Sequence, residues 1–272
     1  MMTDISEDTD QPVCLTIAGL DPSGGAGIVA DIKTFTAHGC FAAAVVSSVT
    51  FQNTTDVFGS VHQTADSVRR QADPVFDDYD IAAAKTGMLP TREIIEEAAA
   101  IFLERGTRKL VVDPVVRSTS GFDLIDDAAL TALIEMLFPL ALVITPNIPE
   151  AERIAGITIK SRDDITLAAR KMQELGARNV LIKGGHFIDD NESPRAAIDH
   201  LFVGDEVILF ENEYIDTKAT HGTGCTLAAA ITANLAHGLE LSEAVRRAKD
   251  FVTDAIRNAT RLGKGHSPLN IR

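Results

Sequence analysis

Tryptophan is absent from this chain, and aromatic residues make up only 5% of its 272 residues. The apolar 45% of the sequence comes mostly from Ala, Ile, Leu and Val. Such a composition is typical of strands covered by helices and disfavours an aromatic-rich β-sandwich. It therefore indicates an α/β fold, and the length suits a single large domain.

Cysteine is also scarce. Cys14, Cys40 and Cys225 are odd in number, widely spaced and free of a CxxC pair, which argues against a disulfide framework or a zinc site. No apolar run approaches the roughly 18 to 20 residues of a membrane span, and residues 1–12 are acidic and polar rather than leader-like. We therefore expect a cytoplasmic protein that does not bind membranes, with residues 1–12 as a short disordered tail and residues 13–272 as one domain.

Basic residues are the third shortage. The chain has 25 Lys and Arg against 39 Asp and Glu, a formal net charge of -14 at pH 7. Binding to a phosphate backbone needs clustered cations, so nucleic acid is not an expected partner. An anionic ligand would have to be held locally, by helix N-termini, glycine-rich backbone, a few placed cations or a metal ion.

Apolar runs and helical patterns alternate along the rest of the chain. Short runs that predict buried strands lie at residues 13–18, 42–49, 81–84, 110–112, 141–144 and 180–182. Helical patterns lie at residues 28–37, 64–77, 91–105, 126–137, 161–175, 223–236 and 241–258. The alternation predicts right-handed crossovers and a mainly parallel sheet with helices on both faces. Residues 198–202 and 206–210 predict an antiparallel hairpin at one end of this sheet.

The segment Thr-His-Gly-Thr-Gly-Cys-Thr at residues 220–226 is the strongest candidate site, because it precedes an Ala-rich helical stretch. Two glycines let backbone amides approach a ligand and the helix dipole adds positive potential, so Gly222, Thr223 and Gly224 can hold a phosphoryl group. Cys225 lies in the same first turn, where the pKa of a thiol tends to fall, and its thiolate is a candidate general base. The structural alternative is a buried cysteine at a glycine-punctuated helix start.

Loops after the other strands supply further candidates, because ligands of open parallel sheets bind beyond the carboxyl ends of the strands. The Gly-rich loop 19–27 has neither the Gly-Lys-Ser/Thr ending of a P-loop nor the dinucleotide-binding spacing, and Asp31 follows one turn into the next helix. Asp113 and Glu150 suit a hydrated Mg²⁺, and Lys183 can reach a polyphosphate. Each of these charges alone is also compatible with a helix cap or a solvated surface position.

Taken in order, these segments resemble the ribokinase-like superfamily, and more narrowly its hydroxymethylpyrimidine kinase branch, with the vitamin B6 kinases as close relatives. The matching residues are Ala18, Gly19, Asp21, 23–28, 30–31, 33–35, 52–54, Lys85, 87–89, 113–115, 120–121, 145–147, 150–151, 183–186, 221–226, 265–266 and Pro268. The resemblance implies a three-layer α/β/α sandwich with a mainly parallel central sheet and an antiparallel hairpin at one end.

The resemblance also implies an activity. Members transfer the γ-phosphoryl group of ATP, bound with Mg²⁺, to 4-amino-5-hydroxymethyl-2-methylpyrimidine and then to its monophosphate in thiamin biosynthesis, and they often form homodimers. A pyridoxine or pyridoxal kinase on the same fold is the alternative. A non-catalytic vitamin or nucleotide sensor is a further alternative, although the joint presence of Asp113, Glu150, Lys183 and Cys225 argues against it.

Residue roles follow from the same resemblance. The implied anion hole and catalytic residues are Gly222, Thr223, Gly224 and Cys225, with Cys225 standing where sugar kinases of the superfamily carry an Asp base. The implied ATP-binding residues are Lys183, Asp113, Glu150 and Asn147, of which Asp113 and Glu150 lie next to the metal. The implied substrate contacts are Gly19, Asp31, Gln52 and Met88. The amide of Gln52 can independently pair with an aminopyrimidine, donating to a ring nitrogen and accepting from the exocyclic amine.

The sequence departs from the family pattern at Phe51, at the pair Val116-Arg117 and at Ala219. Arg117 follows Asp113 on the same loop. The sequence is compatible both with contact between Arg117 and a phosphate and with a position of Arg117 on the surface of the loop. These departures leave the kinase interpretation intact and bear on the details of the substrate pocket.

Overall fold

The computed structural model describes residues 11–116, 124–184 and 196–272. These residues build a nine-stranded sheet in the order β3-β2-β1-β4-β5-β6-β7-β8-β9. The strands are β1 Val13–Leu20, β2 Phe41–Gln52, β3 Val57–His62, β4 Ile81–Thr86, β5 Leu110–Val112, β6 Val143–Ile144, β7 Asn179–Ile182, β8 Ala196–Val203 and β9 Glu206–Glu213. In the run β2-β1-β4-β5-β6-β7, each strand is parallel to its neighbours. At one edge β3 pairs antiparallel with β2, and at the other β8 pairs antiparallel with both β7 and β9.

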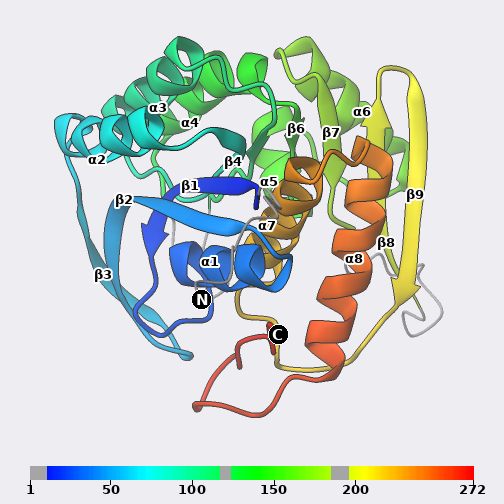
Figure 1. The fold of residues 1–272 in the computed structure, drawn as a ribbon. Coiled ribbons are helices and arrows are strands. Elements are labelled where there is room, and N and C mark those ends of the chain that lie inside the picture. The colour runs from blue at the N-terminus through cyan, green and yellow to red at the C-terminus, as the bar shows by residue number, and fades with distance from the viewer. Residues whose placement is uncertain (1–10, 117–123, 185–195) are drawn as a thin grey trace, which may run out of the picture.

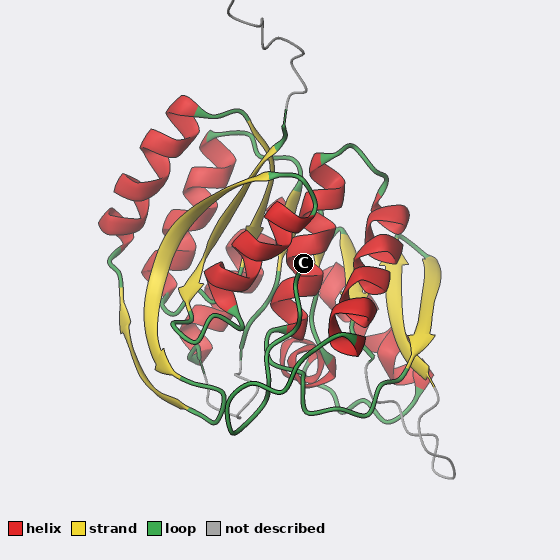
Figure 2. Cartoon of the chain, turned by 60° about the horizontal axis from the view of Figure 1, so that its bottom comes forward, coloured by secondary structure: helices red, strands yellow, loops and turns green. Residues whose placement is uncertain are grey.

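Helices cover both faces of this sheet (Figures 1 and 2). They are α1 Gly27–Ala37, α2 Ala65–Asp78, α3 Arg92–Glu104, α4 Asp127–Ala132, α5 Ile148–Ala155, α6 Arg162–Glu174, α7 Thr223–Ala236 and α8 Leu241–Arg257. A π turn, Leu133–Leu137, and a 3-10 turn, Phe138–Leu140, continue α4 towards β6. Helices α2 to α6 pack on one face and α1, α7 and α8 on the other, which makes three α/β/α layers.

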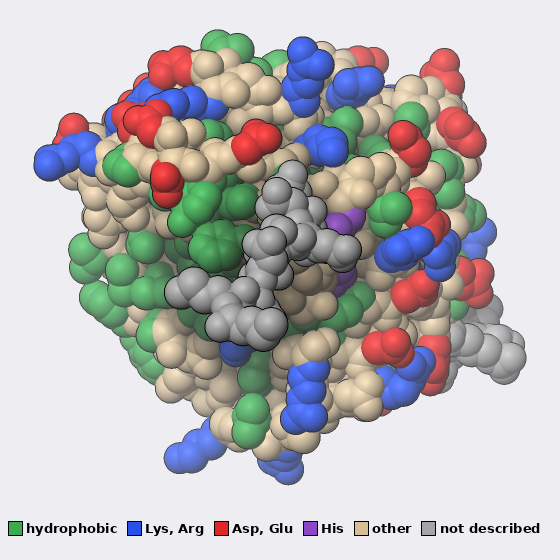
Figure 3. Space-filling model, in the orientation of Figure 1, with side chains coloured by type: hydrophobic (Ala, Val, Ile, Leu, Met, Phe, Trp, Pro, Cys, Tyr) green, Lys and Arg blue, Asp and Glu red, His purple; other side chains and the backbone are tan. Residues whose placement is uncertain are grey.

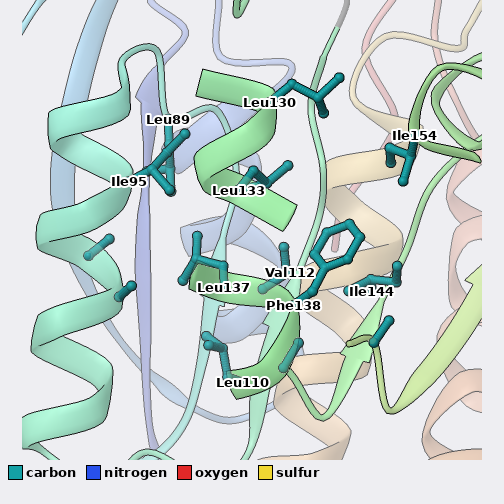
Figure 4. Close-up of a cluster of buried hydrophobic side chains, with 14 of the residues drawn as sticks. Leu89, Ile95, Leu110, Val112, Leu130, Leu133, Leu137, Phe138, Ile144 and Ile154 are labelled. Atoms are coloured by element: carbon teal, nitrogen blue, oxygen red, sulfur yellow. The ribbon is translucent and has the colours of Figure 1, made fainter. Parts of the chain in front are cut away.

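The central strands are buried on both faces. Val112 and Ile144 point into the core beneath α3 and α4, where they meet Leu133 and Phe138 (Figure 4). Val111, the neighbour of Val112, points to the opposite face and packs with residues of α7 and α8. Successive residues of a strand face opposite sides, so a strand covered on both faces reads as a continuous apolar run, as β5 does. These two cores fix the carboxyl ends of the strands, where the candidate residues stand.

The predicted three-layer fold, its parallel sheet and its terminal hairpin are confirmed, and two elements differ from the prediction. Strand β3 was not among the predicted strands; it carries Gly59, a residue type depleted in strands, and forms by pairing with β2, which extends to Gln52. Helix α5 was not among the predicted helices either, and it carries Pro149 in its first turn. Proline is tolerated in the first turn of a helix, because a backbone N–H at that position has no acceptor within the helix and its absence costs no hydrogen bond.

Residues 11 and 12 are attached to the body of the protein. The Gln11 side chain donates to the Gly39 carbonyl over 3.0 Å, and the Phe41 amide donates to the Pro12 carbonyl over 2.9 Å. The remainder of the predicted tail lies outside the described residues, as do Arg117, residues 120–121 and residues 185–186. Within the described ranges, none of the helices combines the length and apolar character that crossing a bilayer requires.

Candidate active site

A pocket of about 180 Å³ opens at the carboxyl edge of the sheet, where the loops after β1, β2, β4, β5, β6 and β7 meet the start of α7. Many of these loops gather at the lower end of the molecule in Figure 2. The predicted residues that line the pocket are Gly19, Gln52, Met88, Asp113, Asn147, Glu150, Lys183, Gly222, Thr223, Gly224 and Cys225. Residues from six loops therefore converge on one cavity, and Asp31 is the predicted site residue that does not line it.

The start of α7 is shaped by a glycine at its N-cap. Gly222 has a φ of +83°, and a Cβ added there would lie 1.8 Å from the carbonyl oxygen of Gly25. Both the left-handed backbone and the close approach require glycine. The first amides of a helix have no acceptor within the helix, and they carry the positive end of its dipole. The helix starts at the pocket wall, where such amides are suited to an anion, although the Thr223 amide already donates to the Thr220 carbonyl over 3.3 Å.

The first Gly-rich loop is organised by Asp21, a residue without a predicted role. Its carboxylate accepts hydrogen bonds from the amides of Ser23, Gly25 and Ala26, over 2.7, 3.1 and 2.8 Å. It also lies 2.9 Å from His221 Nε2. Burial would raise the pKa of Asp21, but the hydrogen bonds from His221 and Ser23 lower it to about 2. A single carboxylate thus joins the loop after β1 to the loop before α7.

A Lys–Asp pair lies beneath the N-terminus of α7. Lys183 Nζ is 3.0 Å from Asp113 Oδ1, and the Thr145 hydroxyl donates to the same oxygen over 2.9 Å. A Cβ on Gly224 would lie 3.1 Å from Lys183 Nζ and 3.9 Å from Asp113 Oδ2, so the pair directly faces the helix start. Burial opposes ionisation of Asp113, yet Lys183 and Lys85 hold its pKa below the usual value. The cation and the carboxylate both line the pocket at the start of α7.

Asn147 and Glu150 form a capping box at the start of α5. The Asn147 side chain accepts from the Glu150 amide over 2.9 Å, and Glu150 Oε2 accepts from the Asn147 amide over 2.8 Å. Burial raises the pKa of Glu150 to about 7, against the opposing charge of Lys183. Asn147 and Glu150 therefore form a helix cap, which was the structural alternative for Glu150. The same cap holds the Glu150 carboxylate at the edge of the pocket.

The structure places Asp31 in a sealed ion pair below the pocket. Its Oδ2 accepts from the Thr16 hydroxyl over 2.7 Å and from Lys85 Nζ over 3.1 Å, and both side chains of the ion pair are fully buried. Among the described residues, Asp31 Oδ1 has no hydrogen-bond partner. Burial raises the pKa of Asp31, although Lys85 and Thr16 favour the ionised form. Lys85 was recognised only as part of a motif, because 54 residues separate it from its partner.

Cys225 stands on the pocket wall in the first turn of α7. Burial raises the pKa of its thiol to about 11, while the nearby Lys85 ammonium acts in the opposite direction. The expectation that the helix start lowers this pKa is therefore wrong for the ligand-free protein. Burial is the largest cause, and the carboxylates of Asp113 and Asp31 act in the same direction.

The remaining pocket wall is suited to a flat ring. Met88 is buried, with its sulfur 3.1 Å from the position of a Cβ on Gly19, so any side chain at Gly19 would displace it. The Ser47 hydroxyl donates to the Met88 carbonyl over 2.6 Å and fixes this loop. Gln52, at the end of β2, presents an amide to the same cavity. An apolar floor with one amide at its rim can hold and orient a small heterocycle.

A second and larger cavity, of about 760 Å³, adjoins the pocket. The two cavities share Asn147, Lys183, Thr223 and Gly224. The far wall of the groove is largely apolar and was not predicted from the sequence; it includes Ile215, Leu227, Val252 and Ile256. The spacing of Lys249, Val252, Thr253 and Ile256 along one face of α8 is the signal that could have indicated it. The start of α7 thus lies between two cavities.

A family model described as phosphomethylpyrimidine kinase matches residues 21–270. The chain belongs to this family. Among relatives, the hydroxymethylpyrimidine/phosphomethylpyrimidine kinase of Bacillus subtilis is 44% identical over 256 residues, which cover 94% of this chain and 93% of the relative. The thiamine biosynthesis bifunctional protein ThiED of Geobacter sulfurreducens is 46% identical over 256 residues, and the match spans 94% of this chain but only 51% of that protein.

Solved structures support the same assignment to the phosphomethylpyrimidine kinase family. The phosphomethylpyrimidine kinase of Clostridium difficile superimposes with a TM-score of 0.79 at 41% identity, covering 90% of this chain and all of that one. An ADP complex of a Bacillus subtilis pyridoxal kinase superimposes with a TM-score of 0.87 at 38% identity, covering 96% and 97%. The predicted kinase family and fold are confirmed, and the role of each individual residue stays a prediction.

Proposed function

We propose that this protein phosphorylates 4-amino-5-hydroxymethyl-2-methylpyrimidine with ATP, and then phosphorylates the monophosphate to the diphosphate, as a cytoplasmic enzyme of thiamin biosynthesis. The observation that carries the proposal is the junction of two cavities at the N-terminus of α7, above the Lys183–Asp113 pair. Family membership supports the same reaction. A donor in the larger groove and an acceptor in the smaller pocket would meet at this junction.

Phosphoryl transfer depends mainly on positioning and on charge stabilisation. The nucleotide occupies the groove, with Lys183 and Asn147 near its phosphates. The amides at Gly222, Thr223 and Gly224 hold the phosphoryl group as it passes from ADP to the acceptor. Because α7 starts directly above Lys183, the dipole and the cation act on the same group.

The residues near Lys183 also fit a magnesium ion. Mg²⁺ in kinases takes one or two protein carboxylates together with water and substrate phosphates. Asp113 and Glu150 supply two carboxylates, each held by side-chain or backbone hydrogen bonds. Their mutual repulsion contributes to the raised pKa of Glu150, which a bound cation would relieve. The ion supplies charge neutralisation at the phosphates when it is bound.

Cys225 is proposed as the group that receives the acceptor proton. The thiol first releases its own proton to water, and the thiolate then takes the hydroxymethyl proton as the O–H bond breaks, the new O–P bond forms, and the bond to ADP breaks. The raised pKa disfavours a standing thiolate, so the Lys85 ammonium and the α7 dipole must favour it during transfer. Loss of this proton step is tested by the Cys225 variants described in the Discussion.

Two pocket features favour the pyrimidine over other acceptors. Gln52 can pair with the exocyclic amine and a ring nitrogen of an aminopyrimidine. Asp31 Oδ1 has no partner among the described residues and would accept a further N–H, although its full burial means that a ligand must first open a path to it. The solved pyridoxal kinase at 38% identity keeps a B6 vitamer as the alternative acceptor.

A homodimer is part of the proposal. Strand β3 is an unpaired sheet edge, and Phe51, Phe58 and Val61 of the β2–β3 ribbon are 51%, 67% and 54% exposed. Hydrophobic side chains gather on this side of the molecule in Figure 3. An exposed apolar edge strand is a template for pairing with another chain. Light scattering should give twice the 29.1 kDa chain mass, and a Phe58→Asp variant should give the single mass.

A coupled ADP-release assay with Mg·ATP tests the activity. Hydroxymethylpyrimidine, its monophosphate, pyridoxal and pyridoxine are compared at equal concentrations. Turnover of both pyrimidine compounds supports the proposal. Turnover of the B6 vitamers alone would replace the acceptor while keeping the reaction type, and turnover of none would favour the non-catalytic sensor.

A further inference from the structure

The last residues of the chain return to the pocket. After α8 ends at Arg257, residues 262–268, here named the C-terminal strap, run below the sheet (red in Figure 1). The His266 amide donates to the Thr54 carbonyl over 2.8 Å, and the amides of Lys264 and Gly265 lie 3.2 Å from the Thr54 hydroxyl oxygen. The strap therefore binds the loop between β2 and β3, which lines the pocket.

The other end of the strap binds the loop before α7. The Ser267 amide donates to the Lys218 carbonyl over 3.0 Å, and His221 pairs with Pro268 in an isolated bridge. Packing against Thr54 is close, because a Cβ on Gly265 would lie 2.0 Å from the Thr54 carbonyl oxygen. The strap is thus held at both ends between the ring side and the phosphate side of the pocket.

His266 carries its side chain into this junction. His266 is exposed and lines the pocket, and its Nδ1 lies 3.1 Å from the Thr220 hydroxyl, two residues before the N-cap of α7. The contact with Thr220 therefore places the His266 imidazole beside the loop that leads into α7. The second ring nitrogen, Nε2, has no hydrogen-bond partner among the described residues.

The His266 imidazole differs from the other basic groups of the pocket in having no carboxylate partner among the residues that the structure describes. Lining carboxylates are Asp21, Asp56, Asp113 and Glu150. Lys183 is already paired with Asp113, and His221 with Asp21. Three of the described pocket residues can carry positive charge, namely Lys183, His221 and His266. Of these, His266 is the one without a carboxylate partner in the described parts of the chain.

The two transfers of the proposed reaction make different demands on the pocket. The first acceptor is a neutral alcohol, whereas the second is a phosphate monoester with about two negative charges near pH 7. One phosphate oxygen attacks, and the α7 amides already hold the incoming phosphoryl group. The other oxygens of the acceptor phosphate need a separate donor, in a pocket lined mainly by carboxylates.

We propose that His266 Nε2 binds the phosphate of the monophosphate acceptor, which makes His266 a specificity-determining residue for the second transfer. The inference rests on the proposed function and adds to it a residue that distinguishes its two steps. Thr54 and the strap act as positioning elements, because they set the place of the imidazole. A purely structural role for His266 would instead affect both acceptors alike.

The test compares wild type with His266→Asn, whose shorter amide can keep the bond to Thr220 while removing Nε2. We expect kcat/KM for the monophosphate to fall by roughly tenfold to a hundredfold, mainly through KM, because a charge-assisted hydrogen bond is lost. For the hydroxymethyl alcohol the loss should stay below about threefold. Arg261→Ala, which removes an exposed cation just before the strap, is the matched control and should change neither value.

Calorimetric titration of the monophosphate without ATP separates this inference from the proposed function. Wild type should bind it at least tenfold more tightly than His266→Asn. Equal losses for both acceptors, no loss for either, or equal monophosphate affinity of the two proteins would overturn the role of His266. Failure of wild type to release ADP with any acceptor would instead count against the proposed function, whatever the binding result.

Discussion

Two Lys–Asp pairs lie near Cys225 and differ in how far they are exposed. Asp31 and Lys85 are both fully buried below the pocket, whereas Lys183 keeps 15% and Asp113 3% of their side chains exposed where the two cavities meet. The pKa of Asp31 is raised and that of Asp113 is lowered, because burial dominates at Asp31 while Asp113 has two lysines nearby. The same chemical pair is therefore sealed inside the protein in one place and open to the pocket in the other, where the proposed function assigns it to the phosphates.

The largest expected effect comes from breaking the sealed pair. Lys85→Met would leave the Asp31 carboxylate buried without its counter-ion, which costs about 3 to 5 kcal/mol of unfolding free energy. Urea denaturation followed by circular dichroism measures the loss. The double variant Asp31→Asn/Lys85→Met should recover most of it, since no charge is left unpaired; a double variant as unstable as the single one would contradict this account.

Breaking the open pair should act on catalysis more than on folding. Lys183→Met removes the cation at the point of transfer, and we expect kcat to fall roughly 10²- to 10³-fold. The unfolding free energy should change by less than it does in Lys85→Met, because Asp113 still has Lys85 nearby. Steady-state ADP release gives the first value and urea denaturation the second, with Lys171→Met in α6 as the control. A larger loss of stability than of activity would reverse the contrast between the two pairs.

Cys225 lies near both pairs, and its substitution tests whether the proton step matters. Cys225→Ala should lower kcat by about a hundredfold, the lower range for removal of a general base. Cys225→Ser should recover little of this, because a serine hydroxyl ionises even less readily than a thiol. Single-turnover rates under saturating Mg·ATP measure the effect, and an undiminished rate in either variant would remove the proposed role.

The smallest effect concerns the carboxylate beside the open pair. Burial raises the pKa of Glu150 from 4.5 to about 7. Between these values the folded state keeps a proton that the unfolded chain has released, so stability falls as pH rises through this window and the loss levels off above about pH 7.

Glu150→Gln should therefore flatten the pH dependence by about 2 kcal/mol between pH 5 and pH 8, measured without ligand. Glu135→Gln, at an exposed position, is the control and should leave the profile of wild type. A profile for Glu150→Gln that matches wild type would show that Glu150 does not titrate in this range.

The sequence predicted those parts of the site that depend on local pattern. Glycines before an Ala-rich run indicated the start of α7, and apolar runs ending in Asp113 and Lys183 indicated the edge where they meet. Pairings across long separations had no local signal, which is why the partnership of Asp31 with Lys85 and the strap over Thr54 were not predicted. Strand β3 likewise depends on β2 for its existence, and the apolar groove wall depends on how α8 packs on the sheet.

The contact between Gly25 and Gly222 also governs when activity can appear during synthesis. These residues lie far apart in the sequence, and the bridge from His221 to Pro268 adds a still later residue to the same point. Long-range contacts form late, after the intervening chain has been made and folded. A growing polypeptide can therefore complete its parallel sheet before Gly25 meets Gly222, so the pocket at the start of α7 is assembled only after Pro268 has been synthesised.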